Sequence, residues 1–207
     1  MDVIMLNIFC AGKNYALHAR EMNSAVPDEP MIFSKATHAL SIADGSILNM
    51  PWEKGSVHYE VELVFELSQP YETGMKPEDC IGYMGVGIDF TLRDVQTEAR
   101  KKGDPWLKSK SFPGSALLTQ LFSFESVDEV NNRTFSLEIN GERVQHGSPS
   151  DMIFHLSELL PYISEHFGTG KGDLIFTGTP EGIGAVHQGD ELSLIYDGEV
   201  KGTSVIG

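Results

Sequence analysis

The chain has 207 residues, of which 41% are hydrophobic, enough for the core of one medium-sized domain over residues 1–207. Its 30 acidic residues outnumber 15 basic ones and give a formal charge of −15, which argues against nucleic acid or an anionic membrane as partner. The chain has only two cysteines, too few for a disulfide framework, and it shows neither a basic and apolar leader nor a stretch long enough to span a bilayer. These features predict a cytoplasmic protein in a reducing compartment.

Short segments separated by Gly and Pro turns dominate the chain and favour strands. The expected strands are LNIFCAG (6–12), MIFSK (31–35), VHYEVELVFEL (57–67), GYMGVGIDF (82–90), TFSLEI (134–139), ERVQ (142–145), DLIFTG (173–178) and ELSLIYDGEVKG (191–202). Asn140-Gly141, between two alternating segments, is a strong signal for a hairpin turn.

Helical patterns are few. A short helix fits residues 14–22, and a longer one fits 155–167, with Ser157 as its candidate cap and Gly168 as its terminator. Pro161 lies either near the start of this helix or at a kink in it. The expected fold class is a β-rich α+β domain, a mixed β-roll or sandwich with a few short helices.

The segment 57–67 carries acids on one face of a predicted strand. His58, Glu60, Glu62 and Glu66 share that face, while six apolar residues share the other. Side chains at i and i+2 lie about 7 Å apart, so Glu60 and Glu62 can converge on one point. Two carboxylates that close repel each other unless a cation lies between them. The alternative is the solvated face of an antiparallel strand.

A third carboxylate is expected from the next strand. Asp89 shares a face with Gly85 and Gly87, and glycines in a strand usually indicate close approach of a backbone or a ligand. Three oxygen donors without Cys or clustered His favour Mg²⁺, Mn²⁺ or Ca²⁺ over a structural zinc, and leave positions for water or substrate. The alternative for Asp89 is an acid in a turn at a strand end.

Basic residues concentrate directly after Asp89. Six of the 15 lie within residues 93–110. Arg100, Lys101 and Lys102 fit a solvated, salt-bridged surface turn. Arg93 and Lys110 are the two that can return toward the acids and meet an anionic substrate.

The segment GTPEGIG (178–184) suggests phosphate binding only superficially. It lacks the P-loop lysine, and a strand rather than a helix follows it, so neither a Walker nor a dinucleotide site is expected. Such a loop can present backbone N–H groups and the Thr179 hydroxyl to a carboxylate, or it can be an ordinary turn.

Five segments in this order resemble the fumarylacetoacetate hydrolase family, in particular its short acylpyruvate hydrolase and oxaloacetate tautomerase branch. They are GKNYALHAREM, HYEVELV, IDFTLRDVQ, KKGDPWLKSKSF and GDLIFTGTPEGIG. The resemblance implies the C-terminal-domain β-roll of that family and a homodimer.

The resemblance also implies roles for individual residues. It implies that Mg²⁺ or Mn²⁺ is held by Glu60, Glu62 and Asp89. It implies that the substrate is surrounded by Arg93, Gln96, Lys110 and Thr179. It identifies His18 and Glu21 as a water-activating pair, and their spacing of three places them on one face of a helical turn.

Two departures concern loops. Family members often have Lys-Pro where this chain has Lys35-Ala36, and Cys-Pro where it has Ala116-Leu117. Substrate size and the conformation of the 110–120 loop therefore stay open.

The expected reaction is metal-dependent hydrolysis of a carbon–carbon bond in a 2,4-dioxo acid of the acylpyruvate or fumarylpyruvate type. The metal and Lys110 would stabilise the negative charge of a metal-bound enolate, and His18 would activate water by removing a proton from it. The same site suits oxaloacetate enol–keto tautomerisation or decarboxylation. Isomerisation or decarboxylation of an unsaturated 2-oxo dioic acid is a further alternative. A non-catalytic, Ca²⁺-stabilised carboxylate-binding module is the alternative outside catalysis.

Overall fold

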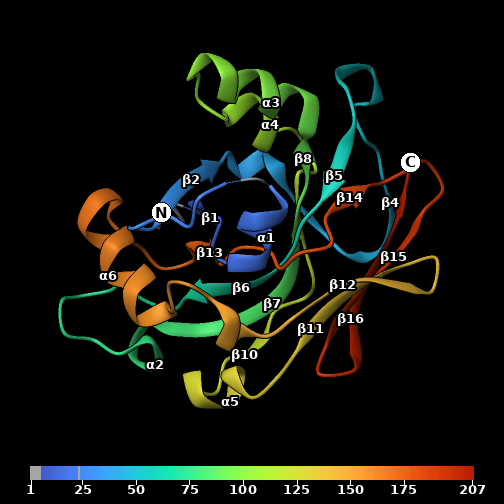
Figure 1. Cartoon of the computed structure of the whole chain (residues 1–207). Helices are drawn as coiled ribbons and strands as arrows, with labels where there is room; N and C mark the ends of the chain where they lie inside the picture. Colours follow the sequence, from blue (N-terminus) through green and yellow to red (C-terminus); the bar gives the residue numbers. More distant parts are fainter. Residues whose placement is uncertain (1–5, 23) are drawn as a thin grey trace, which may run out of the picture.

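The structure is a computed structural model that describes residues 6–22 and 24–207. Its largest sheet has eight strands and curls through the molecule (Figure 1), in the order β2-β1-β13-β6-β7-β9-β3, with β10 paired to β7. These strands are β1 (Ile8–Gly12), β2 (Met31–Lys35), β3 (Leu40–Ile42), β6 (Val61–Leu67), β7 (Ile81–Asp89), β9 (Ala116–Leu118), β10 (Phe122–Ser123) and β13 (Leu174–Phe176). The β1–β13 and β3–β9 pairs are parallel, and the other pairs are antiparallel.

Two smaller sheets complete the β structure. The five-stranded sheet has the order β12 (Glu142–Gly147), β11 (Phe135–Ile139), β15 (Glu191–Tyr196), β16 (Glu199–Ile206) and β4 (Asp44–Leu48). The three-stranded sheet has the order β14 (Gly184–Ala185), β5 (Val57–Tyr59) and β8 (Thr91–Leu92). Asn140 and Gly141 join β11 to β12 with φ values of 54° and 79°, so the predicted hairpin is confirmed.

The helices are short and lie around the sheets. They are α1 (Ala16–Glu21), α2 (Pro77–Cys80), α3 (Arg93–Lys102), α4 (Leu107–Lys110), α5 (Val127–Asn131) and α6 (Leu156–Phe167), with 3₁₀ turns η1 (Thr37–Ala39), η2 (Trp52–Lys54) and η3 (Pro149–Asp151). Helices α3 and α4 lie together at one end of the large sheet (Figure 1). No helix within the described part of the chain is long and apolar enough to cross a membrane.

Helix α6 confirms the predicted element but not its cap. His155, rather than Ser157, is the N-cap, and the Glu158 side chain accepts a hydrogen bond of 3.0 Å from the His155 backbone N–H. Pro161 lies inside the helix. Gly168 ends it with a φ of 74°, as predicted, because glycine adopts a left-handed φ without the steric cost of a side chain.

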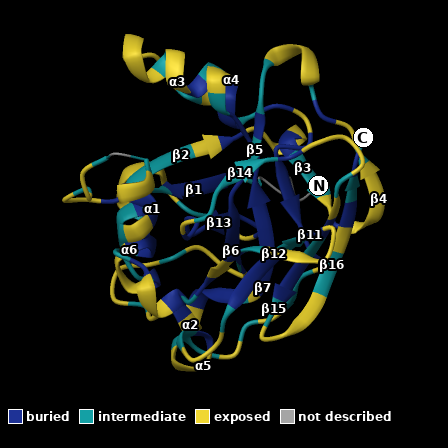
Figure 2. Cartoon of the chain, turned by 45° about the vertical axis from the view of Figure 1, so that its right-hand side comes forward, coloured by how far each residue is buried: buried dark blue, intermediate teal, exposed yellow. Residues whose placement is uncertain are grey.

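The core lies between the sheets (Figure 2), and the strand 57–67 crosses it. That segment divides at Glu60: β5 belongs to the three-stranded sheet and β6 to the large one. Its apolar face is buried, and on the other face Glu60 and Glu62 are only 5% and 2% exposed, while His58 and Glu66 are half-buried. The solvated-face alternative is therefore wrong. The β-rich α+β roll is confirmed, and it encloses carboxylates that need charge partners.

Candidate active site

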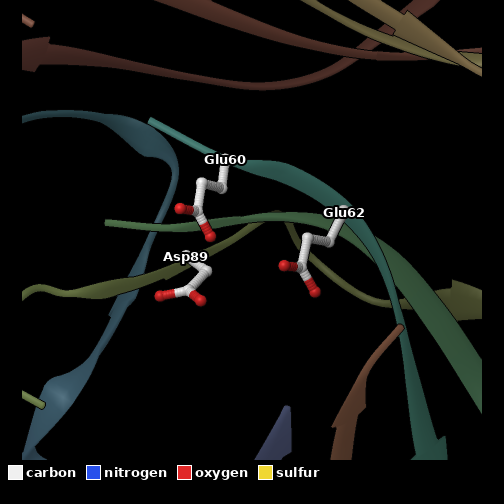
Figure 3. A group of neighbouring side chains, drawn as sticks. All are labelled: Glu60, Glu62 and Asp89. Carbon is white, nitrogen blue, oxygen red and sulfur yellow. The ribbon is translucent and has the colours of Figure 1, made fainter. Parts of the chain in front are cut away.

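Three carboxylates meet where β6 and β7 lie side by side. Asp89 is the last residue of β7, and its backbone N–H donates to the Glu60 carbonyl at 2.9 Å. One oxygen from each of Glu60, Glu62 and Asp89 lies within 4.8 Å of the others. Figure 3 shows the three side chains turned toward one common region. We call this group the acid triad.

The glycines beside Asp89 serve packing rather than ligand access. A Cβ at Gly87 would lie 2.7 Å from side-chain atoms of Phe176 and Val64, and a Cβ at Gly85 would lie 2.9 Å from the Thr119 hydroxyl. A cavity lies over the acid triad, and all three acids line it. Neither glycine lines this cavity. The glycines therefore indicated the correct strand, but they are required by close packing of neighbouring side chains and not by a bound ligand.

Lysine and arginine side chains neutralise two of the three acids. Lys110 Nζ lies 2.7 Å from Glu60 Oε2 and 2.6 Å from Asp89 Oδ2, and Arg93 Nη2 lies 2.5 Å from Glu60 Oε1. Burial alone would raise the pKa of Glu60, but Lys110 and Arg93 outweigh it and hold that pKa below its ordinary value. Burial would also lower the pKa of Lys110, but Asp89 and Glu60 raise it above its ordinary value. Lys110 is thus a charged ammonium.

Glu62 is the acid with the weakest charge compensation. Its Oε2 accepts a 2.7 Å hydrogen bond from the Gly178 backbone N–H, and within residues 6–22 and 24–207 no Lys or Arg nitrogen lies within 4.0 Å of it. Burial raises the pKa of Glu62, and the charges of Asp89 and Glu60 raise it further. The loop after β13 therefore presents an N–H to a carboxylate, but to one of the protein's own.

Lys35 is a site residue that sequence reasoning missed. It ends β2, is buried, and places Nζ 2.7 Å from Asp89 Oδ1 and 3.2 Å from the Ser115 hydroxyl, with a further bond to the Lys110 carbonyl. Lys35 thus forms an ion pair with Asp89 Oδ1, although within the described residues that oxygen accepts no hydrogen bond of good geometry. One feature of the sequence could have indicated Lys35: a lysine at the end of the largely apolar strand 31–35.

The predicted His18–Glu21 pair forms on α1. His18 Nδ1 lies 3.3 Å from Glu21 Oε2, and the Gly182 backbone N–H donates to Glu21 Oε1 at 3.2 Å. His18 is buried and lines the same cavity as the acid triad, whereas Glu21 does not line that cavity. Glu21 is thus placed to orient the imidazole, leaving Nε2 as the nitrogen without this contact.

The remaining predicted residues line this cavity too: Arg93, Gln96, Lys110 and Thr179. Arg93 Nη1 donates to Gln96 Oε1 at 2.6 Å. Thr179 Oγ1 accepts a 2.9 Å bond from Gln145, which also accepts a 2.8 Å bond from the Val61 backbone N–H. Gln145 was missed, because β12 lies far from β6 in sequence.

The acid triad fits a divalent metal ion. Its ligand atoms are buried carboxylate oxygens. Among the described residues, Asp89 Oδ1 accepts no aligned hydrogen bond although Lys35 Nζ lies 2.7 Å away, and no Lys or Arg forms an ion pair with Glu62. Hard oxygen donors in this number suit Mg²⁺, Mn²⁺ or Ca²⁺. A cation there would relieve the repulsion that burial imposes on Glu62.

Comparison with known proteins agrees with this geometry. The family profile described as fumarylacetoacetate (FAA) hydrolase C-terminal matches residues 7–204. The chain belongs to the fumarylacetoacetate hydrolase family. This confirms the resemblance found in the sequence and the fold class expected from it.

Relatives of this fumarylacetoacetate hydrolase family chain are enzymes. The oxaloacetate tautomerase YcgM of Escherichia coli is 40% identical over 100% of this chain and 95% of its own length. The human mitochondrial oxaloacetate tautomerase FAHD1 is 37% identical over 95% of this chain and 90% of its own. The fumarylpyruvate hydrolase of Pseudomonas aeruginosa, solved with Mn²⁺ and pyruvate, is 33% identical, with a TM-score of 0.89 over 97% of this chain and 88% of its own. The protein is an enzyme, which removes the non-catalytic module as an alternative.

Glu62→Gln should raise the melting temperature of the metal-free protein near neutral pH and abolish its stabilisation by Mg²⁺. The folded-state pKa of Glu62 is raised, so its contribution to stability is full below the unfolded pKa and is lost as pH rises through the folded pKa. The amide keeps an acceptor for Gly178 N–H but carries no charge. Calorimetric melts with and without Mg²⁺ measure both effects. A metal-free variant that melts lower than wild type at neutral pH contradicts this prediction.

Proposed function

We propose that this enzyme catalyses enol–keto tautomerisation of oxaloacetate. Identity of 36–40% to seven curated oxaloacetate tautomerases, over 90% or more of the chain, carries the proposal. The sequence, read with its family resemblance, placed hydrolysis first, and these relatives move tautomerisation ahead of it. Both reactions pass through an enolate, so the chemistry asked of the acid triad is common to them.

The polar side chains predicted from the sequence have the following roles in this proposal. Lys110 stabilises negative charge on the enolate oxygen, and Arg93 with Gln96 orients the substrate carboxylate. His18 Nε2 moves the proton: the enol O–H bond breaks, and a C–H bond forms at C3. Thr179, fixed by Gln145, completes the substrate contacts.

We propose Mg²⁺, or Mn²⁺ in its place, as the cofactor held by Glu60, Glu62 and Asp89. The ion, when bound, supplies a Lewis acid for the substrate oxygens. The fit of the acid triad to a hard divalent cation supports this assignment.

Hydrolysis of 2,4-dioxo acids is the second candidate reaction, and the His18–Glu21 pair favours it. A histidine oriented by a carboxylate over the site is the arrangement that activates water. Water would add to the distal carbonyl carbon, the carbon–carbon bond would break, and pyruvate enolate and a carboxylic acid would leave. The fumarylpyruvate hydrolase relative is consistent with this reaction.

Two ultraviolet assays test the proposal. The decay of enol-oxaloacetate and that of acetylpyruvate would be followed with purified protein, each with Mg²⁺ and with EDTA. We expect Mg²⁺-dependent acceleration of enol-oxaloacetate decay without loss of total oxaloacetate. Mg²⁺-dependent loss of acetylpyruvate with release of pyruvate would instead place hydrolysis first. Inactivity in both assays contradicts the proposed function.

We also propose a single catalytic domain over residues 1–207, acting as a cytoplasmic homodimer on a small 2-oxo acid. The shared core cluster between the sheets supports the single domain, and the two free, buried cysteines agree with a reducing compartment. The dimer rests on the family resemblance. Light scattering should give twice the 22.8 kDa mass of one chain. A mass of one chain at micromolar concentration contradicts the dimer.

A further inference from the structure

The loop 178–182, between β13 and β14, is bound at both ends to carboxylates of the site. Gly178 N–H donates to Glu62 Oε2 at 2.7 Å, and Gly182 N–H donates to Glu21 Oε1 at 3.2 Å. Glu62 belongs to the acid triad, and Glu21 contacts the imidazole on α1. The loop therefore joins the acid triad to the helix that carries the proposed catalytic histidine.

The two ends of this loop fit tightly against their neighbours. A Cβ added to Gly178 would lie 2.7 Å from Asn14 Cβ, and one added to Gly182 would lie 2.6 Å from the Val144 carbonyl oxygen. Cβ atoms in proteins do not approach other atoms so closely, so only glycine allows both contacts. Val144 belongs to β12, and the residue that follows it contacts the middle of the loop.

That residue, Gln145, holds the loop through its side-chain amide. Its Nε2 donates to Thr179 Oγ1 and to the Pro180 carbonyl, both at 2.9 Å. Its Oε1 accepts a 2.8 Å hydrogen bond from the Val61 backbone N–H. The side chain is buried, so each of these bonds replaces one that water would otherwise supply. One amide thus connects the loop to β6.

The bond to Val61 lies at the point of β6 where the acids are. Val61 stands between Glu60 and Glu62 in sequence. Strand β13 pairs with β6 at residues 64–66 and ends before Val61, so the Gln145 amide occupies the place of a neighbouring strand there. A buried backbone N–H needs such an acceptor. Gln145 is therefore fixed against the same stretch of strand that carries two members of the acid triad.

We propose that Gln145 is a positioning residue, which holds loop 178–182 in the conformation needed for the reaction. In that conformation Thr179 lines the cavity, and the loop keeps Glu21 against His18. This inference rests on the proposed function, in which Thr179 contacts the substrate and His18 transfers the proton. Gln145 does not line the cavity, so it acts through the loop rather than on the substrate.

Gln145→Met tests this role, because methionine has a similar size but cannot replace the amide bonds. We expect kcat for enol-oxaloacetate to fall by about 10- to 100-fold, as the base loses its alignment. A second readout needs no turnover: oxalate, an unreactive planar analogue of a 2-oxo acid enolate, would be titrated calorimetrically into the Mg²⁺-loaded protein. Its affinity should fall by about 10-fold, as when a hydrogen bond to a charged ligand is lost.

A double-mutant cycle on oxalate affinity separates positioning from a general structural role. Thr179→Val should weaken oxalate binding by about 10-fold, and adding Gln145→Met should then weaken it by less than about twofold more, because both changes remove the same contact. Ser204→Ala is the control for lost stability. Ser204 is equally buried in the five-stranded sheet, donates to the Ser46 carbonyl at 2.8 Å and does not line the cavity, so its variant should keep wild-type kcat and oxalate affinity.

The outcomes distinguish this inference from the proposed function. Wild-type kcat and oxalate affinity in Gln145→Met, effects of Gln145→Met and Thr179→Val that simply multiply, or no oxalate binding to wild type overturns the positioning role. A wild-type protein inactive on oxaloacetate and acetylpyruvate, in which the oxalate cycle still shows the expected coupling, would overturn the proposed function and support the role of Gln145.

Discussion

His18→Ala should lower turnover of oxaloacetate, and of acetylpyruvate where it is hydrolysed, by about 10²- to 10⁴-fold, the usual contribution of a positioned general base. His18 is buried over the acid triad, and Glu21 contacts its Nδ1, so Nε2 is the nitrogen placed for proton transfer. The effect should fall on kcat, because Arg93 and Lys110 keep their positions in the variant. Steady-state kinetics at saturating Mg²⁺ measures it.

Two companion variants define what this result means. Glu21→Gln keeps a hydrogen-bond partner for Nδ1 but removes its charge, so we expect a smaller loss than for His18→Ala. His187→Ala is the control, since the His187 side chain is 80% exposed and does not line the cavity. Mg²⁺ affinity by titration should stay unchanged in all three. A fully active His18→Ala protein removes the assigned role.

Lys110→Met should both slow catalysis and destabilise the metal-free protein. Deleting one partner of a buried ion pair typically costs about 3–5 kcal/mol, and here two buried carboxylates, Glu60 and Asp89, lose one ammonium. Catalysis should fall by about 10²- to 10³-fold, as when a donor to a developing oxyanion is removed. Urea unfolding without metal and kinetics with metal measure the two effects separately.

Mg²⁺ should restore stability to Lys110→Met more than it restores activity. A divalent ion at the acid triad compensates Glu60 and Asp89, whereas only the lysine supplies the donor assigned to the substrate oxygen. Lys108→Met removes the same charge from an exposed position of α4 and should match wild type in both measurements. Rescue of activity to the wild-type level would show that Lys110 acts only as a counterion.

The acid triad could be predicted from two strand patterns. Strand periodicity places Glu60 and Glu62 on one face of segment 57–67, and Asp89 lies in the next predicted strand, 82–90. The pattern could not reveal that this face is buried. Burial depends on which strands cover it, and here β5 and β6 join different sheets on either side of Glu60. The family resemblance, rather than periodicity, supplied His18, Gln96 and Thr179.

The missed residues share one physical cause. Lys35 approaches Asp89 and Gln145 approaches Thr179 across 54 and 34 positions of sequence, and no local pattern encodes either contact.

Three acids and three basic side chains, those of Lys110, Arg93 and Lys35, lie together at this site. When all six groups are ionised, their formal charges cancel. A divalent cation alone would leave two positive charges in a buried space, and a dianionic 2-oxo diacid alone would leave two negative ones. Together they restore neutrality. Cation and substrate should therefore each strengthen the binding of the other by the same factor, so that the enzyme retains its ion most firmly while a diacid is present.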